Sequence, residues 1–436
     1  MTAAPLIPAP DLNLTGEAAL VVALSGGLDS MVLLHALASM PEARKRGLRA
    51  VHIHHGLYGD ADAWANHCEE TCAALHVPLR SVRVEVARDG GEGLEAAARR
   101  ARHAALAAEL GDDEVLALAH HRDDQAETFL LRALRSSGID GLGAMRRWRR
   151  FDPGWLWRPL LDRSRTELLA YAQAHGLRWI DDPSNADVAF DRNFLRQRVL
   201  PLLRERWPQA EAAFARSAEL CAEATDLLGS DDARALAQVR TADTHTLSRT
   251  ALRALAPARR ARVLRMWVNE FGLPPLPAEG IARIEAEVLN ARDDAGPQFG
   301  WHGATVHAWR DLLHADWQHE ALPADWNREW DGKTPLVLPD GSQLRLTCVT
   351  GFEQAFVVHA RRGGERIVLP GRSHSHTLKH VLQDLGVPPW TREGLPLLSD
   401  AKGALHAVGD MAYSETFELW LREHHARLLW NRAPHQ

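Results

Sequence analysis

Apolar runs of strand length alternate with helical patterns through the first half of the chain. The strand-like runs cover residues 20–24, 48–54, 78–86 and 115–119, and helical patterns follow at 30–40, 60–76, 94–110 and 123–134. The first run, Leu-Val-Val-Ala-Leu, is wholly apolar and contains β-branched residues, which favour strands. Repeated units of this kind predict an α/β fold, a parallel doubly wound sheet with helices on both faces.

The pattern changes near residue 207. From there to about residue 237 the chain is rich in Ala, Glu and Arg at helical spacing, and further helical patterns cover 252–271 and 278–291. Residues 316–340 indicate a linker or irregular edge, and short strand patterns return from residue 343 with one helix at 378–385. We therefore predict three domains: the doubly wound domain at 1–206, a mainly helical middle domain at 207–335 and a small α+β domain at 336–436.

Composition is that of an ordinary globular protein. Of the 436 residues 46% are hydrophobic and 25% are charged, and no segment approaches the ~20 apolar residues of a membrane helix. The N-terminus lacks the pattern of a secretory signal, so cytoplasmic residence without membrane contact is expected. The net charge of −6 gives no overall attraction to nucleic acid, but arginine is clustered at 99–102, 146–150, 192–206, 259–265 and 361–372. Each cluster alone is most simply a solvated face, whereas five together favour a basic surface that suits phosphate contacts.

The cysteines are Cys68, Cys72, Cys221 and Cys348. They form no Cys-x-x-Cys pair, and Cys68 and Cys72 stand one helical turn apart within a helical pattern. Buried or inert thiols are therefore favoured over a metal or redox role.

A glycine turn joins the first predicted strand to its helix. It consists of Ser25, Gly26, Gly27, Leu28, Asp29 and Ser30. Two glycines let backbone N–H groups approach an anion, and the following helix directs the positive end of its dipole toward it. The turn lacks the lysine of the GxxxxGK[ST] loop and carries Asp29, which would repel bare phosphate, so magnesium is the expected mediator. An ordinary turn capped by Ser and Asp is the alternative.

Polar residues also follow the second and third predicted strands. His54 ends the second strand. The residues there are either a turn with exposed histidines or a contact to a ligand. Glu95 and Arg99 stand four residues apart after a glycine-rich turn, so they share a helix face. A surface salt bridge is the simple interpretation, and an anion site or a carboxylate that holds an amine is the functional one.

The most polar segment follows the fourth strand and runs from His120 to Thr128. His120 and Asp124 are spaced to face one another across a turn. Asp123 and Asp124 suit the positive end of a helix dipole, so capping is the simple interpretation. With Glu127, a second histidine and a glutamine, the segment is more polar than capping requires. Histidine can take a proton near neutral pH and a carboxylate can bind magnesium or an amine, so we favour a functional site.

Two polar segments lie beyond residue 180. Residues 181–185, Asp-Asp-Pro-Ser-Asn, have the composition of a turn. A helix opens near Asp191, with Arg192 and Arg196 on one face and Asn193 between them. Composition alone leaves binding and a solvated surface equally open. In a doubly wound sheet, ligands bind beyond the carboxyl ends of the strands, at the point where the strand order reverses. Each polar cluster in the first half of the chain follows the carboxyl end of a predicted strand.

Ser-Gly-Gly-x-Asp-Ser after a first strand resembles the signature of the PP-loop ATP pyrophosphatases. This resemblance implies cleavage of ATP between the α and β phosphates and adenylation of a carbonyl or carboxylate oxygen. Six further motifs follow in order: HHGL, GLEAAAR, HHRDDQAET, RPLL, DPSN and DRNFLR. Together the seven motifs resemble the tRNA(Ile)-lysidine synthetases over nearly all of residues 18–205. One departure is Arg122, where an apolar or small residue is commoner. The later segments resemble that family's middle and C-terminal domains, which implies that both bind tRNA.

The resemblance implies a ligase with ATP and magnesium as cofactors. Its substrates would be free L-lysine and an isoleucine tRNA with a CAU anticodon, whose wobble cytidine is adenylated by ATP and then attacked by the lysine ε-amine to give lysidine, AMP and pyrophosphate. ATP is expected on residues 25–30 and on the backbone at His54. The candidate catalytic residues are Asp29, His120 as acceptor of the lysine proton, and Asp124. Asp29 and Asp124 are also the candidate magnesium ligands. Lysine or tRNA is expected to contact Glu95, Arg99, Asp123, Glu127, Arg192, Asn193 and Arg196.

Two other functions are alternatives to this one. A tRNA thiolase of the same superfamily would commonly use cysteine thiolates or an iron–sulfur cluster from Cys-x-x-Cys pairs, which the chain lacks. A non-catalytic RNA-binding protein with a relic nucleotide fold would not need the acids that stand in every motif.

Overall fold

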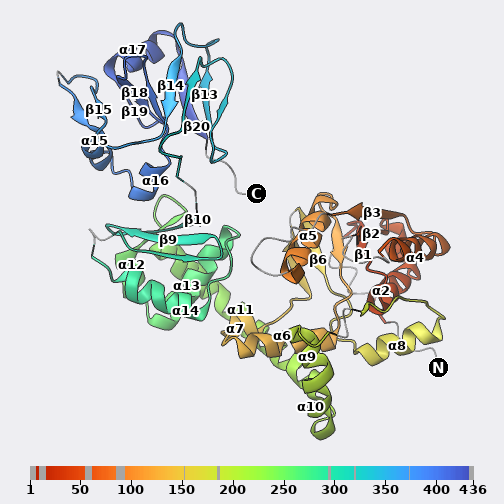
Figure 1. The fold of residues 1–436 in the computed structure, drawn as a ribbon. Coiled ribbons are helices and arrows are strands. Elements are labelled where there is room, and N and C mark those ends of the chain that lie inside the picture. Colours follow the sequence, from red (N-terminus) through yellow and green to blue (C-terminus); the bar gives the residue numbers. More distant parts are fainter. Residues whose placement is uncertain are drawn as a thin grey trace. The chain divides into compact units, whose positions relative to one another are not determined.

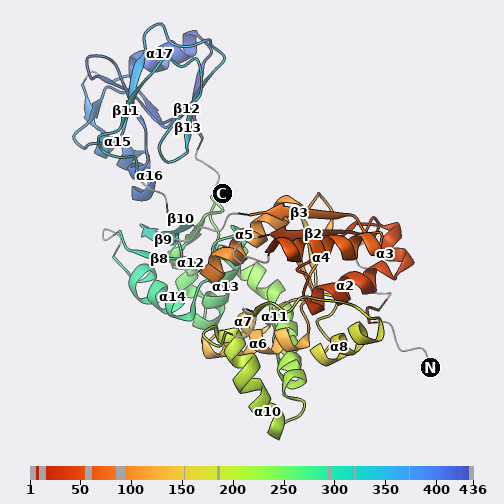
Figure 2. The same cartoon turned by 45° about the vertical axis from the view of Figure 1, so that its right-hand side comes forward.

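The computed structural model describes residues 6–8, 16–54, 61–84, 94–151, 153–183, 187–292, 296–318, 321–372 and 374–431 (Figure 1, Figure 2). The chain forms two compact units, Met1–Gly229 and Ser230–Gln436. The strands of the first unit are β1 (Leu20–Ala23), β2 (Arg49–His54), β3 (Leu79–Arg83), β4 (Val115–Ala117), β5 (Trp148–Phe151) and β6 (Gly154–Trp157). Its helices are α2 (Leu28–Ala38), α3 (Pro41–Lys45), α4 (Ala61–Ala74), α5 (Leu94–Ala108), α6 (Arg122–Leu134), α7 (Ile139–Leu142), α8 (Arg165–Ala174), α9 (Asp191–Phe194), the π-helical η2 (Leu195–Val199) and α10 (Leu200–Arg206).

The six strands form one sheet in the order β3-β2-β1-β4-β6-β5. β1 pairs in parallel with both β2 and β4, and β6 pairs in parallel with β4. The predicted doubly wound sheet is thus confirmed, with all four predicted strands in place. β5 is an antiparallel edge strand paired with β6, and this hairpin was not predicted. Its arginine-rich first strand and short length hide the alternation that signals a half-buried strand.

Both faces of the sheet are covered by helices. On one face Leu20 and Val22 of β1 share a core with α2, α8 and the thiols of α4, Cys68 and Cys72. On the other face Val21 packs with Leu106 of α5. Because alternate side chains of β1 point to opposite faces and both faces are dry, the strand must be apolar at every position.

The strand order reverses between β1 and its neighbour β4. From β1 the chain builds outward through β2 to β3, and β4 then returns to the other side of β1. The segments after β1 and β4 therefore leave the sheet side by side at its carboxyl edge. This switch point is where ligands bind in open α/β sheets, and it brings residues 25–30 close to residues 120–124.

The second unit holds two further regions. After α11 (Ala210–Val239), which begins in the first unit, come α12 (Arg249–Ala254), α13 (Pro257–Glu270), α14 (Ala278–Arg283) and η3 (Ile284–Leu289). These helices pack on an antiparallel sheet that was not predicted, in the order β7 (Thr246–Ser248), β10 (Leu312–Trp317), β9 (Ala304–Trp309) and β8 (Gln298–Trp301). The predicted helical region is present, and its missed strands are short and follow helical segments.

The C-terminal region has the α+β composition that was predicted. Its sheets are β11 (Asn327–Trp330), β14 (Phe356–His359), β17 (Leu397–Ser399), β18 (Leu405–Val408) and β19 (Ala412–Tyr413); β12 (Leu336–Val337), β13 (Gln343–Thr347) and β20 (Arg427–Asn431); and β15 (Arg366–Ile367) with β16 (His376–Thr377). Its helices are α15 (Leu378–Asp384), α16 (Pro389–Glu393) and α17 (Glu415–Glu423). The segment interpreted as a linker carries β11 and β12, and the three-domain division stays a prediction. Across the described residues, no helix is long and apolar enough to cross a bilayer.

Candidate active site

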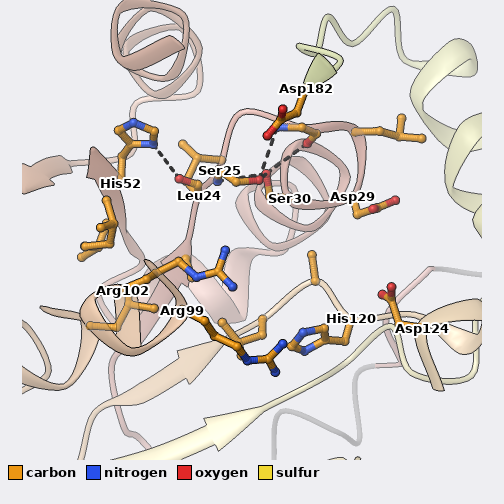
Figure 3. A pocket seen from close by; sticks show the side chains of 18 of the residues that line it. Leu24, Ser25, Asp29, Ser30, His52, Arg99, Arg102, His120, Asp124 and Asp182 are labelled. Carbon is orange, nitrogen blue, oxygen red and sulfur yellow. Dashed lines mark hydrogen bonds between the residues drawn. The ribbon is translucent and has the colours of Figure 1, made fainter. Parts of the chain in front are cut away.

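A cavity of about 400 Å³ lies at the carboxyl edge of the first sheet (Figure 3). The glycine turn, the end of β2, one side of α5 and the residues after β4 line it. Asp181 and Asp182, from the segment after α8, line it as well. The tertiary structure therefore gathers into one space five segments that the sequence had shown separately.

The glycine turn is held open by its own serines. Ser30 Oγ accepts a hydrogen bond from Ser25 N (3.2 Å) and donates one to the carbonyl of Gly27 (3.0 Å). Gly26 has φ +84, and a Cβ there would lie 3.3 Å from Cys68 Sγ, so both backbone and space require glycine. Gly27 is the N-cap of α2 and makes no side-chain capping bond. The helix N-terminus is therefore open to an anion, which disfavours the alternative of a turn capped by Ser and Asp.

His121 joins the two carboxylates of the site. Its Nδ1 accepts from the backbone N–H of Asp123 (3.2 Å) and Asp124 (3.4 Å), which makes His121 the N-cap of α6. The ring proton is then on Nε2, which lies 3.6 Å from Asp29 Oδ2 and 3.5 Å from Asp124 Oδ2. Burial opposes a charge on this ring, yet Asp29 and Asp124 outweigh it and raise the pKa of His121. Sequence reasoning chose His120 and missed this ring.

Asp124 and Asp29 differ in how fully they are bonded. Asp124 Oδ2 accepts from His121 N (3.0 Å) and its Oδ1 accepts from Arg196 Nη2 (3.1 Å). Burial opposes its ionisation, but His121, His120 and Arg196 hold the pKa of Asp124 below its usual value. Asp29 Oδ1, in contrast, is buried without a hydrogen-bond partner among the described residues. An unbonded carboxylate oxygen beside a glycine turn with an open helix N-terminus fits magnesium.

The available ligands suit a magnesium site that has few protein ligands. The described residues contain no cluster of three or more metal-ligating side chains. Magnesium is commonly held by one or two carboxylates together with water and substrate phosphates. Asp29 fits that description better than Asp124, whose two oxygens already have protein partners.

An ion network stands behind Asp124. Arg196 Nε and Nη2 reach the two oxygens of Glu127 at 2.7 and 3.0 Å, and Glu127 is wholly buried. Arg192 lies 3.4 Å from Glu127 and donates to Thr128 Oγ1 (2.9 Å). Burial raises the pKa of Glu127, although Arg196 favours its charged form. The guanidinium of Arg196 thus links Asp124 to the buried carboxylate of Glu127 and holds it in place.

His120 accepts a hydrogen bond from an arginine in this site. Its Nδ1 accepts from Arg158 Nε (3.0 Å), and because a guanidinium can only donate, the proton of the neutral ring is on Nε2. Burial, with Arg158 and Arg192, lowers the pKa of His120 to about 3. A ring of such low basicity with Nδ1 already occupied is a poor proton acceptor, which argues against the base role expected from sequence.

The candidate residues separate into two layers. Those that line the cavity are Ser25, Gly27, Leu28, Asp29, Ser30, His54, Arg99, His120, Asp124 and Arg196. Gly26, Asp123, Glu127, Arg192 and Asn193 lie outside that lining; Asp123 accepts from Arg165 N (3.3 Å) and Asn193 donates to the carbonyl of Asp187 (2.8 Å). Glu95 is in α5, but its side chain lies outside the described residues, as do residues 55–57 and 184–186.

Family models match the chain in three places. A PP-loop domain model matches residues 8–203, a TilS substrate binding domain model matches 247–314, and a TilS substrate C-terminal domain model matches 356–430. Over 435 residues the chain is 55% identical to a tRNA(Ile)-lysidine synthase of Xanthomonas campestris pv. campestris, covering 99% of this chain and 98% of that protein. The chain belongs to the tRNA(Ile)-lysidine synthase family. It is also 56% identical to the synthase of Xanthomonas axonopodis pv. citri (99% and 97% covered) and 51% identical to that of Xylella fastidiosa (98% and 97%).

The two α4 thiols of this tRNA(Ile)-lysidine synthase family member do not suit thiolase chemistry. Cys68 and Cys72 are buried in α4, as predicted. Burial raises the pKa of Cys68 to about 12 and that of Cys72 to about 11, so neither is a thiolate near neutral pH. The thiolase alternative is not favoured.

Two further lining groups were not among the candidate site residues. Arg158 is 7% exposed and holds His120, and the motif Arg-Pro-Leu-Leu, one of the seven motifs quoted from the sequence, was the signal that could have found it. The Asp181–Asp182 pair belongs to the turn for which composition leaves binding and a solvated surface equally open. Its approach is explained by the preceding residue, since Ile180 N donates to the carbonyl of Gly26 (3.0 Å).

Acid should destabilise the first unit through His120. Its pKa falls from 6.5 to about 3 on folding, so between these values the unfolded chain binds more protons and stability is lost as the pH falls. His120→Asn offers Arg158 an acceptor but does not titrate. We expect the melting temperature to drop less for the variant than for the wild type between about pH 7 and about pH 5. Both proteins contain His121, so its opposite contribution cancels, and equal drops would contradict the prediction.

Proposed function

We propose that the chain joins free L-lysine to the wobble cytidine of the CAU anticodon of isoleucine tRNA in an ATP-dependent reaction. Membership of the tRNA(Ile)-lysidine synthase family supports the ligation and its tRNA substrate. The observation that carries the proposal is the meeting, at one switch point, of the uncapped N-terminus of α2 with the carboxylates of Asp29 and Asp124.

Two bond exchanges make up the reaction. The 2-oxo oxygen of cytidine attacks the α-phosphorus of ATP, and pyrophosphate leaves. The lysine ε-ammonium then gives a proton to water, and its neutral nitrogen attacks ring carbon 2. The bond from that carbon to oxygen breaks, and AMP departs with the oxygen. In this proposal the turn at residues 25–30 and the first N–H groups of α2 hold the phosphates, and the backbone at His54 meets the adenine.

The carboxylates have separate tasks in this proposal. Asp29 would hold magnesium, which when bound neutralises phosphate charge. Asp124, which is ionised and fixed by Arg196, would hold the lysine ε-ammonium. The Nε2–H of His120 would donate to an oxygen on which negative charge develops. Arg99 would meet substrate in the cavity.

Four candidates act indirectly in this proposal, as positioning residues. Glu127 and Arg192 orient Arg196, while Asp123 and Asn193 secure the segments around α6 and α9. For Glu95 a lysine or tRNA contact stays a prediction. ATP, tRNA and free lysine meet in the cytoplasm, where we expect the chain to act.

Lysine incorporation into transcribed tRNA tests this function. We expect labelled L-lysine to enter isoleucine tRNA with a CAU anticodon only when ATP and magnesium are present, with release of AMP and pyrophosphate. Methionine tRNA, which has the same anticodon, is the matched substrate control and should stay unlabelled. Absence of label from both tRNAs would contradict the proposal.

A further inference from the structure

Four arginines line one side of the cavity. They are Arg99 and Arg102 of α5, Arg149 of β5, and Arg158, which follows β6. We call these four residues the arginine wall. Figure 3 shows the side chains of Arg99 and Arg102 extending into the cavity on the side away from Ser25. The wall is thus separate from the turn that is proposed to hold the triphosphate.

Two members of the wall, Arg149 and Arg158, are bonded to neutral groups. Arg149 Nη2 lies 2.9 Å from His103 Nε2. Arg158 donates from Nε to His120 Nδ1 (3.0 Å) and from Nη1 to the carbonyl of Arg146 (2.7 Å). Within the described part of the chain, neither Arg149 nor Arg158 has a carboxylate in ion-pair range. Two guanidinium groups therefore face the cavity without a counter-charge from the protein.

These positive charges act on one another. Burial, followed by Arg149 and Arg99, lowers the pKa of Arg158 to about 10. Burial, Arg149 and Arg99 likewise lower the pKa of His103. Gathering like charges at a partly dry surface is unfavourable unless an anion lies between them. A planar guanidinium group can also donate two parallel hydrogen bonds to two oxygens of one phosphate.

The position of the wall selects one anion among those of the reaction. Arg99, Arg102 and Arg149 keep solvent access while Arg158 is buried, so the wall extends from the surface into the cavity. The single carboxylate of lysine would occupy one guanidinium fork. An RNA strand brings one phosphate for each nucleotide, and a base that is modified inside a pocket must enter with its own backbone alongside.

We propose that the arginine wall binds the backbone phosphates on either side of the wobble cytidine as that base enters the cavity. This inference rests on the proposed function, because it takes tRNA as the substrate. It adds Arg102, Arg149 and Arg158 to the residues that hold the RNA. Their task is to fix the strand so that the cytidine oxygen faces the phosphate that is attacked.

Direct binding of an isoleucine tRNA transcript to the full chain, without lysine or ATP, tests the wall. Arg149→Gln and Arg102→Gln are each expected to raise the Kd by about tenfold, as for one lost hydrogen bond to a charged group. Each should also reduce the slope of log Kd against log salt by about one, since one phosphate contact is lost. Both side chains have solvent access, so folding should be unaffected.

Arg150→Gln is the matched control. Arg150 is the neighbour of Arg149 on β5, so its side chain points to the opposite face of the strand, and it lies over the ring of Trp155 at 4.8 Å. It carries the same charge in the same arginine cluster but does not line the cavity. We expect its Kd for tRNA to stay within about twofold of the wild type.

Other outcomes would overturn the inference. If Arg149→Gln and Arg102→Gln bind tRNA as the wild type does and instead need more lysine for half-maximal incorporation, the wall binds the lysine carboxylate. If only the Kd for ATP rises, the wall belongs to the triphosphate. Failure of the proposed function is distinguishable, because the wild type itself would then make no lysidine while the tRNA-binding comparison could still be read.

Discussion

Asp29→Asn should reduce ATP–pyrophosphate exchange in the presence of tRNA by about 10³-fold, the scale of loss when a group that stabilises transferring charge is removed. The Oδ1 atom of Asp29 is buried and has no hydrogen-bond partner among the described residues, so an amide there would lose the charge that fits magnesium. Because adenylation precedes lysine attack, the exchange assay reads this step without the second one.

Asp112→Asn is the control for that substitution. Asp112 is exposed in the turn between α5 and β4 and does not line the cavity, so exchange should stay at the wild-type rate. The melting temperature of Asp29→Asn should stay close to that of the wild type, because the carboxylate is only loosely bonded, with His121 Nε2 at 3.6 Å. Undiminished exchange by Asp29→Asn would remove Asp29 from the catalytic group.

Arg196→Met should lower the stability of the first unit by about 3 kcal/mol, because removal of one partner leaves the buried Glu127 carboxylate without its bidentate ion pair. For a unit of this size the melting temperature would fall by roughly 6–12 °C, measurable by calorimetry. Lysine incorporation should be lost as well, since Arg196 also holds Asp124 Oδ1.

A double variant separates these two effects. Adding Glu127→Met removes the buried carboxylate, which would otherwise face only Arg192 at 3.4 Å, and apolar replacement of a buried ion pair is often neutral, so most of the stability should return. Activity should not return, because Asp124 still lacks its arginine. Arg216→Met, which breaks exposed ion pairs with Glu219 and Glu223, is the control and should leave the melting temperature at the wild-type value. Recovery of activity with stability would show that Arg196 has no role beyond folding.

Local sequence determined the framework of the first unit. An apolar five-residue run, two glycines and a helical pattern are enough to specify strand, turn and helix, because backbone preference and side-chain period act over a few residues. The same logic found the polar segments after β2 and β4 and predicted that they meet at the edge of a parallel sheet. The hairpin of β5 and β6 and the sheet of the second unit escaped, since their short strands are specified by partners rather than by their own pattern.

Tertiary structure alone decided what each candidate side chain faces. Arg192 and Arg196 share a helix face in the sequence, yet only Arg196 reaches the cavity, because α9 and η2 pack against the buried Glu127. The choice between His120 and His121 depends on Arg158, a residue that is distant in sequence, and on Asp29 across the switch point. Burial and charge come from such distant neighbours, so protonation and the arginine wall could not be read from spacing along the chain.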